Sequence, residues 1–327
     1  MVKFNRRYLL RAGLTVGALA TTTQAAAQIG GEKNLVAAPR QRVSQSSEMP
    51  ASHLEKLPDR AIATLLIQCC ELAVFQHQKY LESSAYQGAI RQLDQYSSGF
   101  DRYTQIASFQ TLSLPPQQQS LFHGVALKPS EQLAIAGRRE HFGLALTSTT
   151  HHVIALQASA LPTPPFHPHA YPALTHLVDW DSRQPQLGQV QTQLQQIHQQ
   201  LVPQIQAAVQ QFEPALPCYV TGYSLGGAIA PLVALQIAQH FPALRPQIQV
   251  YTYGAPPVGD RTFAQVYNSL LPNTHGIVNL ADLVPSQPAA TQPIGQTWTY
   301  LTQRGTLGLN HAIETYKTAV MAASEVS

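Results

Sequence analysis

The stretch PCYVTGYSLGGAIAPLVAL, residues 217–235, constrains the fold more than any other part of the sequence. A short apolar run leads into glycines on either side of Ser224, and an apolar run of helical length follows. A tight turn between a strand and a helix leaves little room for Cβ atoms, so small residues are needed two positions before and after its central residue. Gly222 and Gly226 stand at those positions. The stretch therefore predicts a strand–turn–helix unit that presents Ser224 at the N-terminus of a helix.

Segments with strand and helix patterns alternate along the rest of the chain. A long helix is expected after Asp59, which is a suitable N-cap, and a helix over residues 189–212 is expected to be interrupted at Pro203. Beyond Ser224, strands at 248–253 and 276–280 alternate with helices around 262–270 and after His311. This order predicts the α/β class, with a mainly parallel sheet and helices on both faces. Strands are expected before the serine at Tyr103–Phe109, Leu133–Arg138, Gly143–Ser148 and Val153–Ala158.

The N-terminus has the anatomy of a signal peptide. Residues 1–27 combine a basic start, an apolar stretch that is too short to span a membrane, and small residues at its end. Arg6 and Arg7 followed by Tyr-Leu-Leu resemble a twin-arginine export signal, which predicts a periplasmic or extracellular protein. Residues 28–57 are polar and without periodicity, as in a linker. One domain is expected over 58–327.

The charge of the chain argues against nucleic-acid binding. The formal net charge is +3, but residues 1–27 hold four basic side chains and no acid, so without them the charge is −1. A chain with this balance lacks the basic surface that binding to phosphates requires.

A serine hydroxyl becomes a strong nucleophile when a histidine takes its proton and an acid orients that histidine. In strand–turn–helix units of this kind the chain order is serine, acid, histidine. His240 has no acid between it and Ser224, and His275 precedes a strand instead of following one. His311 therefore remains as the base.

Two aspartates are candidates for the acid. Asp282 follows the strand GIVNLA directly, at the carboxyl end where ligands and catalytic groups gather in parallel sheets. Asp260 lies farther beyond its strand and is suited to cap the next helix. Asp282 is the favoured acid, and Asp260 remains the alternative.

A tetrahedral oxyanion needs two N–H donors, one from the residue after the nucleophile and one from a loop after an earlier strand. Leu225 is the first of these. The loop in HHVIALQASALP offers Ser159 as the second.

Four motifs in this order, VTGYSLGGAIAPLVAL, VYTYGAPPVGDRTFA, IVNLADLVPSQP and NHAIETY, resemble the class 3 lipases, the fungal-type triacylglycerol lipases with the α/β-hydrolase fold. The resemblance runs from about residue 143 to 316. It implies that Ser224 is the nucleophile, Asp282 the triad acid and His311 the base. It also implies hydrolysis of acyl esters of lipids without a cofactor.

The chain departs from the family pattern in three places. Gln157-Ala158-Ser159 replaces the usual Arg-Gly-Thr or Arg-Gly-Ser of the oxyanion loop. Gln191-Thr192-Gln193-Leu194 replaces a His-x-Gly-Phe segment, and Pro257 stands where arginine is common. Because the first change affects the oxyanion loop, a catalytically weak lipid- or acyl-binding protein on the same fold is the alternative function.

The proline-rich segment Ala160–Gly188 is the candidate for a lid. It holds apolar side chains that would suit a cover touching a lipid surface: Tyr171, Leu174, Leu177, Val178 and Trp180. The histidines around it, His151-His152 and His167-Pro168-His169, lack the acids or cysteines that would complete a metal site. They are interpreted as solvated loop residues, and no metal is expected.

Overall fold

The computed structural model describes residue 57 and residues 59–112, 139–157, 177–285 and 293–322. Contacts divide the chain into the units Met1–Met49 and Pro50–Ser327, and all of the described residues belong to the second unit. The expected signal segment, most of the expected linker and the expected strand Leu133–Arg138 therefore lie outside the described residues. Within the described ranges, no helix combines the length and apolar character needed to cross a membrane.

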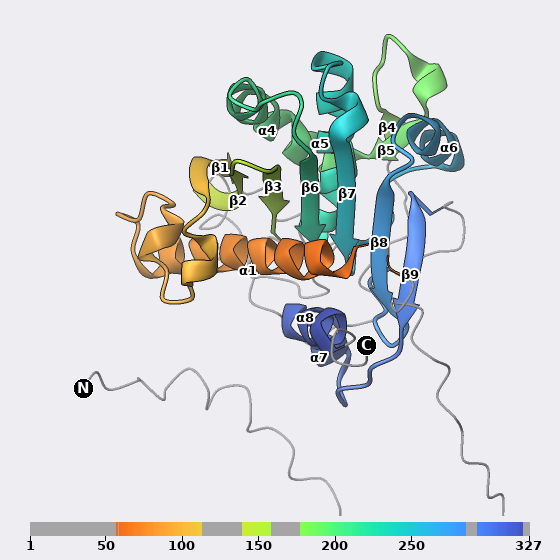
Figure 1. Ribbon diagram of the computed structural model, residues 1–327. Helices are drawn as coiled ribbons and strands as arrows, with labels where there is room; N and C mark the ends of the chain where they lie inside the picture. Colours follow the sequence, from red (N-terminus) through yellow and green to blue (C-terminus); the bar gives the residue numbers. More distant parts are fainter. Residues whose placement is uncertain (1–56, 58, 113–138, 158–176, 286–292, 323–327) are drawn as a thin grey trace, which may run out of the picture. The chain divides into compact units, whose positions relative to one another are not determined.

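Among the described residues, a seven-stranded sheet has the order β1-β2-β3-β6-β7-β8-β9 (Figure 1). The pairs β1–β2 and β2–β3 are antiparallel, and each later pair is parallel. The expected α/β class with a mainly parallel sheet is confirmed. The strands are β1 Thr104–Leu112, β2 Arg139–Thr147, β3 His152–Leu156, β6 Cys218–Tyr223, β7 Ile248–Tyr253, β8 Thr274–Asn279 and β9 Gln296–Tyr300. A separate hairpin pairs β4 Leu177–Asp179 with β5 Gln189–Gln191.

Helices cover both faces of the sheet (Figure 1). Side chains alternate along β3, because successive residues of a strand point to opposite faces. Ile154 packs into the core with α4, α5 and α6, whereas Val153 and Ala155 pack into the core with α1 and α8. The helices are α1 Arg60–Glu82, α4 Thr192–Val209, α5 Leu225–His240, α6 Arg261–Leu270, α7 Leu307–His311 and α8 Ile313–Ala322.

The start of α1 agrees with the sequence. Asp59 is the N-cap, and its carboxylate accepts a hydrogen bond from the backbone N–H of Ile62 at 2.9 Å. This bond satisfies one of the N–H groups that a helix leaves without a partner in its first turn. The expected N-cap of α1 is therefore confirmed.

The expected interruption at Pro203 is wrong, because α4 continues through it to Val209. Proline cannot donate to the carbonyl of Gln199, four residues earlier. Both residues are exposed, so water can hydrate that carbonyl. On the inner side, Leu201 and Ile205 are fully buried, and their packing holds the helix across the missing bond.

Strand β9 was not expected from the sequence. It extends the parallel sheet beyond β8, with Ile277 opposite Trp298 and Asn279 opposite Tyr300. This strand positions the segment that leads to His311. Its residues QTWTY are β-branched or aromatic at four of five positions, a composition typical of strands.

Candidate active site

Ser224 lies in the sharp turn between β6 and α5. Its backbone has φ 56° and ψ −123°, and among the described residues it is the one non-glycine residue with positive φ. Such a conformation costs about 1–3 kcal/mol and persists only where the surroundings hold it. Here the Ser224 N–H donates to the carbonyl of Tyr253 on β7 at 2.9 Å. The turn is therefore fixed from the neighbouring strand.

The glycines around Ser224 are required by close backbone approaches. A Cβ on Gly222 would lie 2.1 Å from the Gly226 carbonyl oxygen. A Cβ on Gly226 would lie 2.5 Å from the carbonyl carbon of Leu156, at the end of β3. The second contact shows that the first turn of α5 lies directly against the loop that leaves β3.

The structure brings Ser224, His311 and Asp282 together in one chain of hydrogen bonds. The Ser224 Oγ lies 2.8 Å from His311 Nε2, and His311 Nδ1 lies 2.6 Å from Asp282 Oδ2. Asp282 and His311 are 2% and 6% exposed. Ser224 comes from the β6–α5 turn, Asp282 from the loop after β8, and His311 from the end of α7. Three distant segments therefore meet at the carboxyl ends of the parallel strands.

Two further donors hold the Asp282 carboxylate. The Val284 N–H donates to Oδ1 at 2.9 Å, and the Tyr316 hydroxyl donates to Oδ2 at 2.6 Å. Burial first, and then the charge of Asp282, raise the pKa of Tyr316 well above its usual value. The phenol therefore keeps its proton and remains a donor. These two donors, together with His311, fix the position of the carboxylate.

Two asparagines join the loop of Asp282 to the loop of His311. The side-chain amide of Asn279 donates to the carbonyl of Asn310 at 3.0 Å, and that of Asn310 donates to the carbonyl of Ala281 at 3.0 Å. Asn279 thus holds the backbone next to His311, and Asn310 holds the backbone next to Asp282. Asn310 also accepts from the Arg304 N–H at 2.7 Å.

His311 is held on its other side by Tyr223. The Tyr223 hydroxyl donates to the His311 carbonyl at 2.5 Å, and the two rings stack with centroids 5.2 Å apart. Farther along, Lys317 on α8 contacts both carboxylate oxygens of Glu71 on α1 at 3.0 Å. The segment that carries His311 is therefore tied to both the sheet and α1.

The oxyanion candidates lie partly within the described residues. Leu225 is the first residue of α5, and the first N–H groups of a helix have no partner inside it. Ser159 lies outside the described residues. The loop leading to it starts at the buried Gln157, whose N–H donates to the Phe142 carbonyl at 3.0 Å and whose amide donates to the His141 carbonyl.

Asp260 caps a helix, as expected, and is not part of the hydrogen-bond chain of Ser224. It is the N-cap of α6, and its Oδ1 accepts from the Phe263 N–H at 2.7 Å and from the Gln189 N–H at 3.1 Å. Its side chain is thus bonded to backbone groups of α6 and β5.

The interpretation of His151 and His152 as solvated loop residues is wrong. Both are buried, with Tyr103 Oη 2.8 Å from His151 Nε2 and Thr147 Oγ1 2.7 Å from His152 Nδ1. Burial lowers the pKa of both imidazoles. His167 and His169 lie outside the described residues. Within the described part of the chain, no three His, Cys, Asp or Glu side chains gather as metal ligands would.

The described end of the lid candidate is anchored to the domain. Trp180 packs against His198 and Phe263, with ring centroids 5.1 and 6.0 Å apart. Leu177 and Val178 are half-buried in β4. The expected lid residues Tyr171 and Leu174 lie outside the described residues.

Sequence reasoning did not identify Tyr316, Tyr223, Asn279 and Asn310 as parts of the site. Asn310 and Tyr316 lie inside the motif NHAIETY, and Asn279 lies inside IVNLADLVPSQP. A buried polar residue close in sequence to a catalytic candidate was the available signal. The partners that these side chains choose depend on tertiary structure.

Part of the chain is similar to known lipases. Residues 168–292 match the family model described as lipase (class 3). A lipase of Caenorhabditis elegans is 38% identical over 79 residues, which cover 24% of this chain and 22% of that protein. A secreted mono- and diacylglycerol lipase of Gibberella zeae is 39% identical over 83 residues, which cover 24% of this chain and 26% of that protein. The matches thus span about a quarter of these relatives.

Among solved structures, lipase II from Rhizopus niveus is similar at a TM-score of 0.49 and 20% identity. The similarity covers 71% of this chain and 76% of that one. The segment matched by the family model holds Ser224 and Asp282 in the expected order. On that match, residues 168–292 of the chain are similar to the class 3 lipases.

Proposed function

We propose that the protein is a serine ester hydrolase that cleaves acyl esters of lipids through an acyl-enzyme. The observation that carries the proposal is the continuous hydrogen-bond chain from Ser224 through His311 to Asp282. This constellation recurs in unrelated hydrolases because it solves one problem, the weak nucleophilicity of a serine hydroxyl.

In the first half of the reaction, His311 Nε2 takes the proton of Ser224 Oγ as the oxygen attacks the ester carbonyl carbon. Asp282 stays ionised and stabilises the imidazolium through Nδ1. The carbonyl oxygen becomes an oxyanion, which accepts hydrogen bonds from the Leu225 N–H and, as a second donor, from Ser159. The N-terminus of α5 adds a positive dipole end at the same place.

The tetrahedral intermediate collapses when His311 gives its proton to the leaving alkoxide. The alcohol departs and an acyl ester on Ser224 remains. Water then gives a proton to His311 and attacks the acyl carbonyl. The second intermediate releases the carboxylic acid and returns the proton to Ser224.

Exposed leucines on the segments that carry Asp282 and His311 favour a lipid-like substrate. Three leucines close in sequence to the triad are between 43% and 60% exposed: Leu280, Leu301 and Leu309. Leu280 lies two residues before Asp282, and Leu309 lies two before His311. The Leu280 N–H donates to the carbonyl of Tyr300, the residue that precedes Leu301. Exposed apolar side chains on the segments that carry the triad acid and base suit contact with acyl chains.

We also propose that the protein is exported. The composition of residues 1–27 supports this, and the Gibberella zeae relative is named as a secreted lipase.

The test is hydrolysis of p-nitrophenyl esters from acetyl to palmitoyl by the wild-type protein and by Ser224→Ala. Turnover that collapses in the variant supports the proposal, and a preference for longer acyl chains supports a lipid substrate. Equal turnover in both proteins would contradict the role of Ser224. No turnover in either, together with saturable fatty-acid binding, would favour the lipid-binding alternative.

A further inference from the structure

Tyr223 is linked to both reacting groups of the candidate triad. It is the last residue of β6 and directly precedes Ser224, so its backbone leads into the turn that holds the nucleophile. Its side chain contacts the proposed base, because its ring stacks on the His311 imidazole with centroids 5.2 Å apart and an interplanar angle of 27°. One residue is therefore covalently joined to Ser224 and in contact with His311.

The hydrogen bond to Asp282 does not by itself fix the plane of the imidazole. It holds Nδ1 of His311 at 2.6 Å from the carboxylate. Hydrogen bonds tolerate a spread of angles, so the ring can still rock about this contact. Rocking changes the distance from Nε2 to Ser224 Oγ, which is 2.8 Å in the structure. A second ring packed against the imidazole face opposes that movement.

The Tyr223 ring is itself firmly held. It is buried, and Tyr316 lies edge-on to it with ring centroids 6.3 Å apart. The backbone of Tyr223 pairs with Tyr253 on β7, in the parallel part of the sheet. Tyr316 also donates to Asp282. The ring that contacts His311 and the acid that accepts from it are therefore supported by the same residue.

The Tyr223 hydroxyl has a different partner from the Tyr223 ring. It donates to the backbone carbonyl of His311 at 2.5 Å. The neighbouring backbone has a further tie, because the Asn279 amide donates to the Asn310 carbonyl at 3.0 Å. Loss of the hydroxyl should therefore leave this backbone in place. Loss of the ring would instead remove a contact made to the imidazole itself.

We propose that Tyr223 is a positioning residue for the base, and that its ring and its hydroxyl have separate roles. The ring holds the plane of the His311 imidazole, so that Nε2 stays directed at Ser224 Oγ during proton transfer. The hydroxyl contributes to stability alone. Position 223 therefore requires an aromatic side chain for full turnover. This inference rests on the proposed ester hydrolysis.

Three variants separate the ring from the hydroxyl and from core packing. Tyr223→Leu should lower kcat for p-nitrophenyl butyrate by about tenfold to a hundredfold and change KM less than about twofold. Tyr223→Phe should keep kcat within about threefold of wild type but unfold at a lower urea concentration. Tyr219→Leu is the matched control, because Tyr219 is buried in the same strand and the same core but packs against His151. Its kcat should equal that of wild type.

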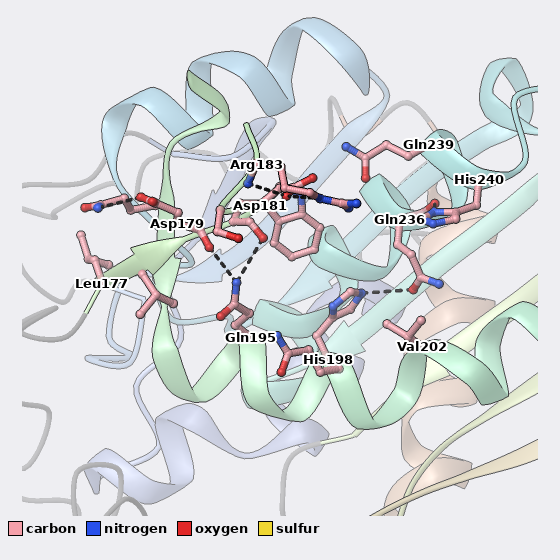
Figure 2. A pocket seen from close by; sticks show the side chains of 15 residues that line it. Leu177, Asp179, Asp181, Arg183, Gln195, His198, Val202, Gln236, Gln239 and His240 are labelled. Atoms are coloured by element: carbon pink, nitrogen blue, oxygen red, sulfur yellow. Dashed lines mark hydrogen bonds and ion pairs between the residues drawn. The ribbon is translucent and has the colours of Figure 1, made fainter. Parts of the chain in front are cut away.

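Proton NMR of protein labelled with ¹⁵N-histidine tests the same contact without a substrate. The Nδ1–H signal of His311 is assigned by its absence in His311→Gln. It should be lost through exchange with water in Tyr223→Leu and retained in Tyr223→Phe and Tyr219→Leu. His198 provides the internal reference, because it is a second buried imidazole, with Nε2 3.1 Å from Gln236 Oε1, as Figure 2 shows. Its Nε2–H signal should be the same in all variants.

Equal kcat values in Tyr223→Leu and Tyr219→Leu, or an unchanged His311 signal in Tyr223→Leu, would overturn the proposal. So would a fall in kcat as large in Tyr223→Phe as in Tyr223→Leu, because the hydroxyl would then be the group that matters. If Tyr223→Leu does not fold, Tyr223→Met replaces it, since methionine fills irregular gaps in a core. A wild-type protein that hydrolyses no ester would contradict the proposed function, and the NMR comparison would still decide the role of Tyr223.

Discussion

The bond from Tyr316 to Asp282 yields the sharpest prediction about the site. Tyr316→Phe removes one hydroxyl from a fully buried ring and keeps the rest of its packing. The lost bond is 2.6 Å long and ends on a carboxylate. The same hydroxyl accepts from the Asn279 N–H at 3.3 Å, which is left without this partner. The variant therefore weakens the support of Asp282 without opening a large cavity.

The magnitude follows from the charge of the acceptor. A hydrogen bond to a charged group contributes about 1.5–3 kcal/mol, against about 1 kcal/mol for a neutral pair. The longer bond from Asn279 adds little. We expect the free energy of unfolding to fall by about 2 kcal/mol. With one donor fewer, the Asp282 carboxylate orients His311 less firmly, so kcat should fall.

Tyr300→Phe is the matched control. Tyr300 is also buried, and its ring lies edge-on to Tyr316 with centroids 5.7 Å apart, but its hydroxyl has no partner among the described residues. Removing an unsatisfied buried hydroxyl should leave the unfolding free energy equal or slightly higher. Both variants are compared by urea unfolding and by p-nitrophenyl butyrate kinetics. Equal stability losses in the two variants, or an unchanged kcat in Tyr316→Phe, would refute the reasoning.

Two other predictions concern the asparagine bridge and the buried histidine. Asn310→Ala removes the hydrogen bonds to Ala281 and Arg304 and should lower kcat more than it raises KM. The control Asn268→Ala loses hydrogen bonds to Pro293 and Gly295, outside the triad loops, and should leave kcat unchanged. Similar kcat values in the two variants would contradict this prediction. Burial lowers the pKa of His198 from 6.5 to about 4. Between pH 6.5 and pH 4 the unfolded chain therefore binds a proton on His198 that the folded protein does not bind. The folded state loses stability as the pH falls through this range. For wild type this loss amounts to about 3 kcal/mol between about pH 7 and pH 4. His198→Gln lacks the imidazole, so its unfolding free energy should fall by about 3 kcal/mol less over the same range. Plots of unfolding free energy against pH that run parallel for the two proteins would contradict this prediction.

Local sequence signals predicted much of the fold. The Asp59 cap, the strand before Ser224 and the helix after it all have their cause within a few residues, in capping, β-propensity and glycine crowding. Features that depend on tertiary packing were predicted less well. Pro203 does not end α4, because buried residues on either side hold the helix, and β9 became a strand through pairing with β8.

The same division holds for the candidate site. Chain order and position at strand ends selected Ser224, Asp282 and His311, and these three side chains meet in the structure. Tyr316 and the two asparagines were not selected, because nothing local indicates where a buried polar side chain finds its partner. His151 was misjudged for the same reason, since its partner Tyr103 is distant in sequence.

The central claim is that His311 activates Ser224 as a nucleophile. The direct measurement is covalent labelling with a fluorophosphonate, followed by intact mass and peptide mapping. One adduct per chain is expected on the peptide that contains Ser224, with labelling abolished in Ser224→Ala and strongly slowed in His311→Ala. An unlabelled wild-type protein, or an adduct on another residue, would contradict the claim.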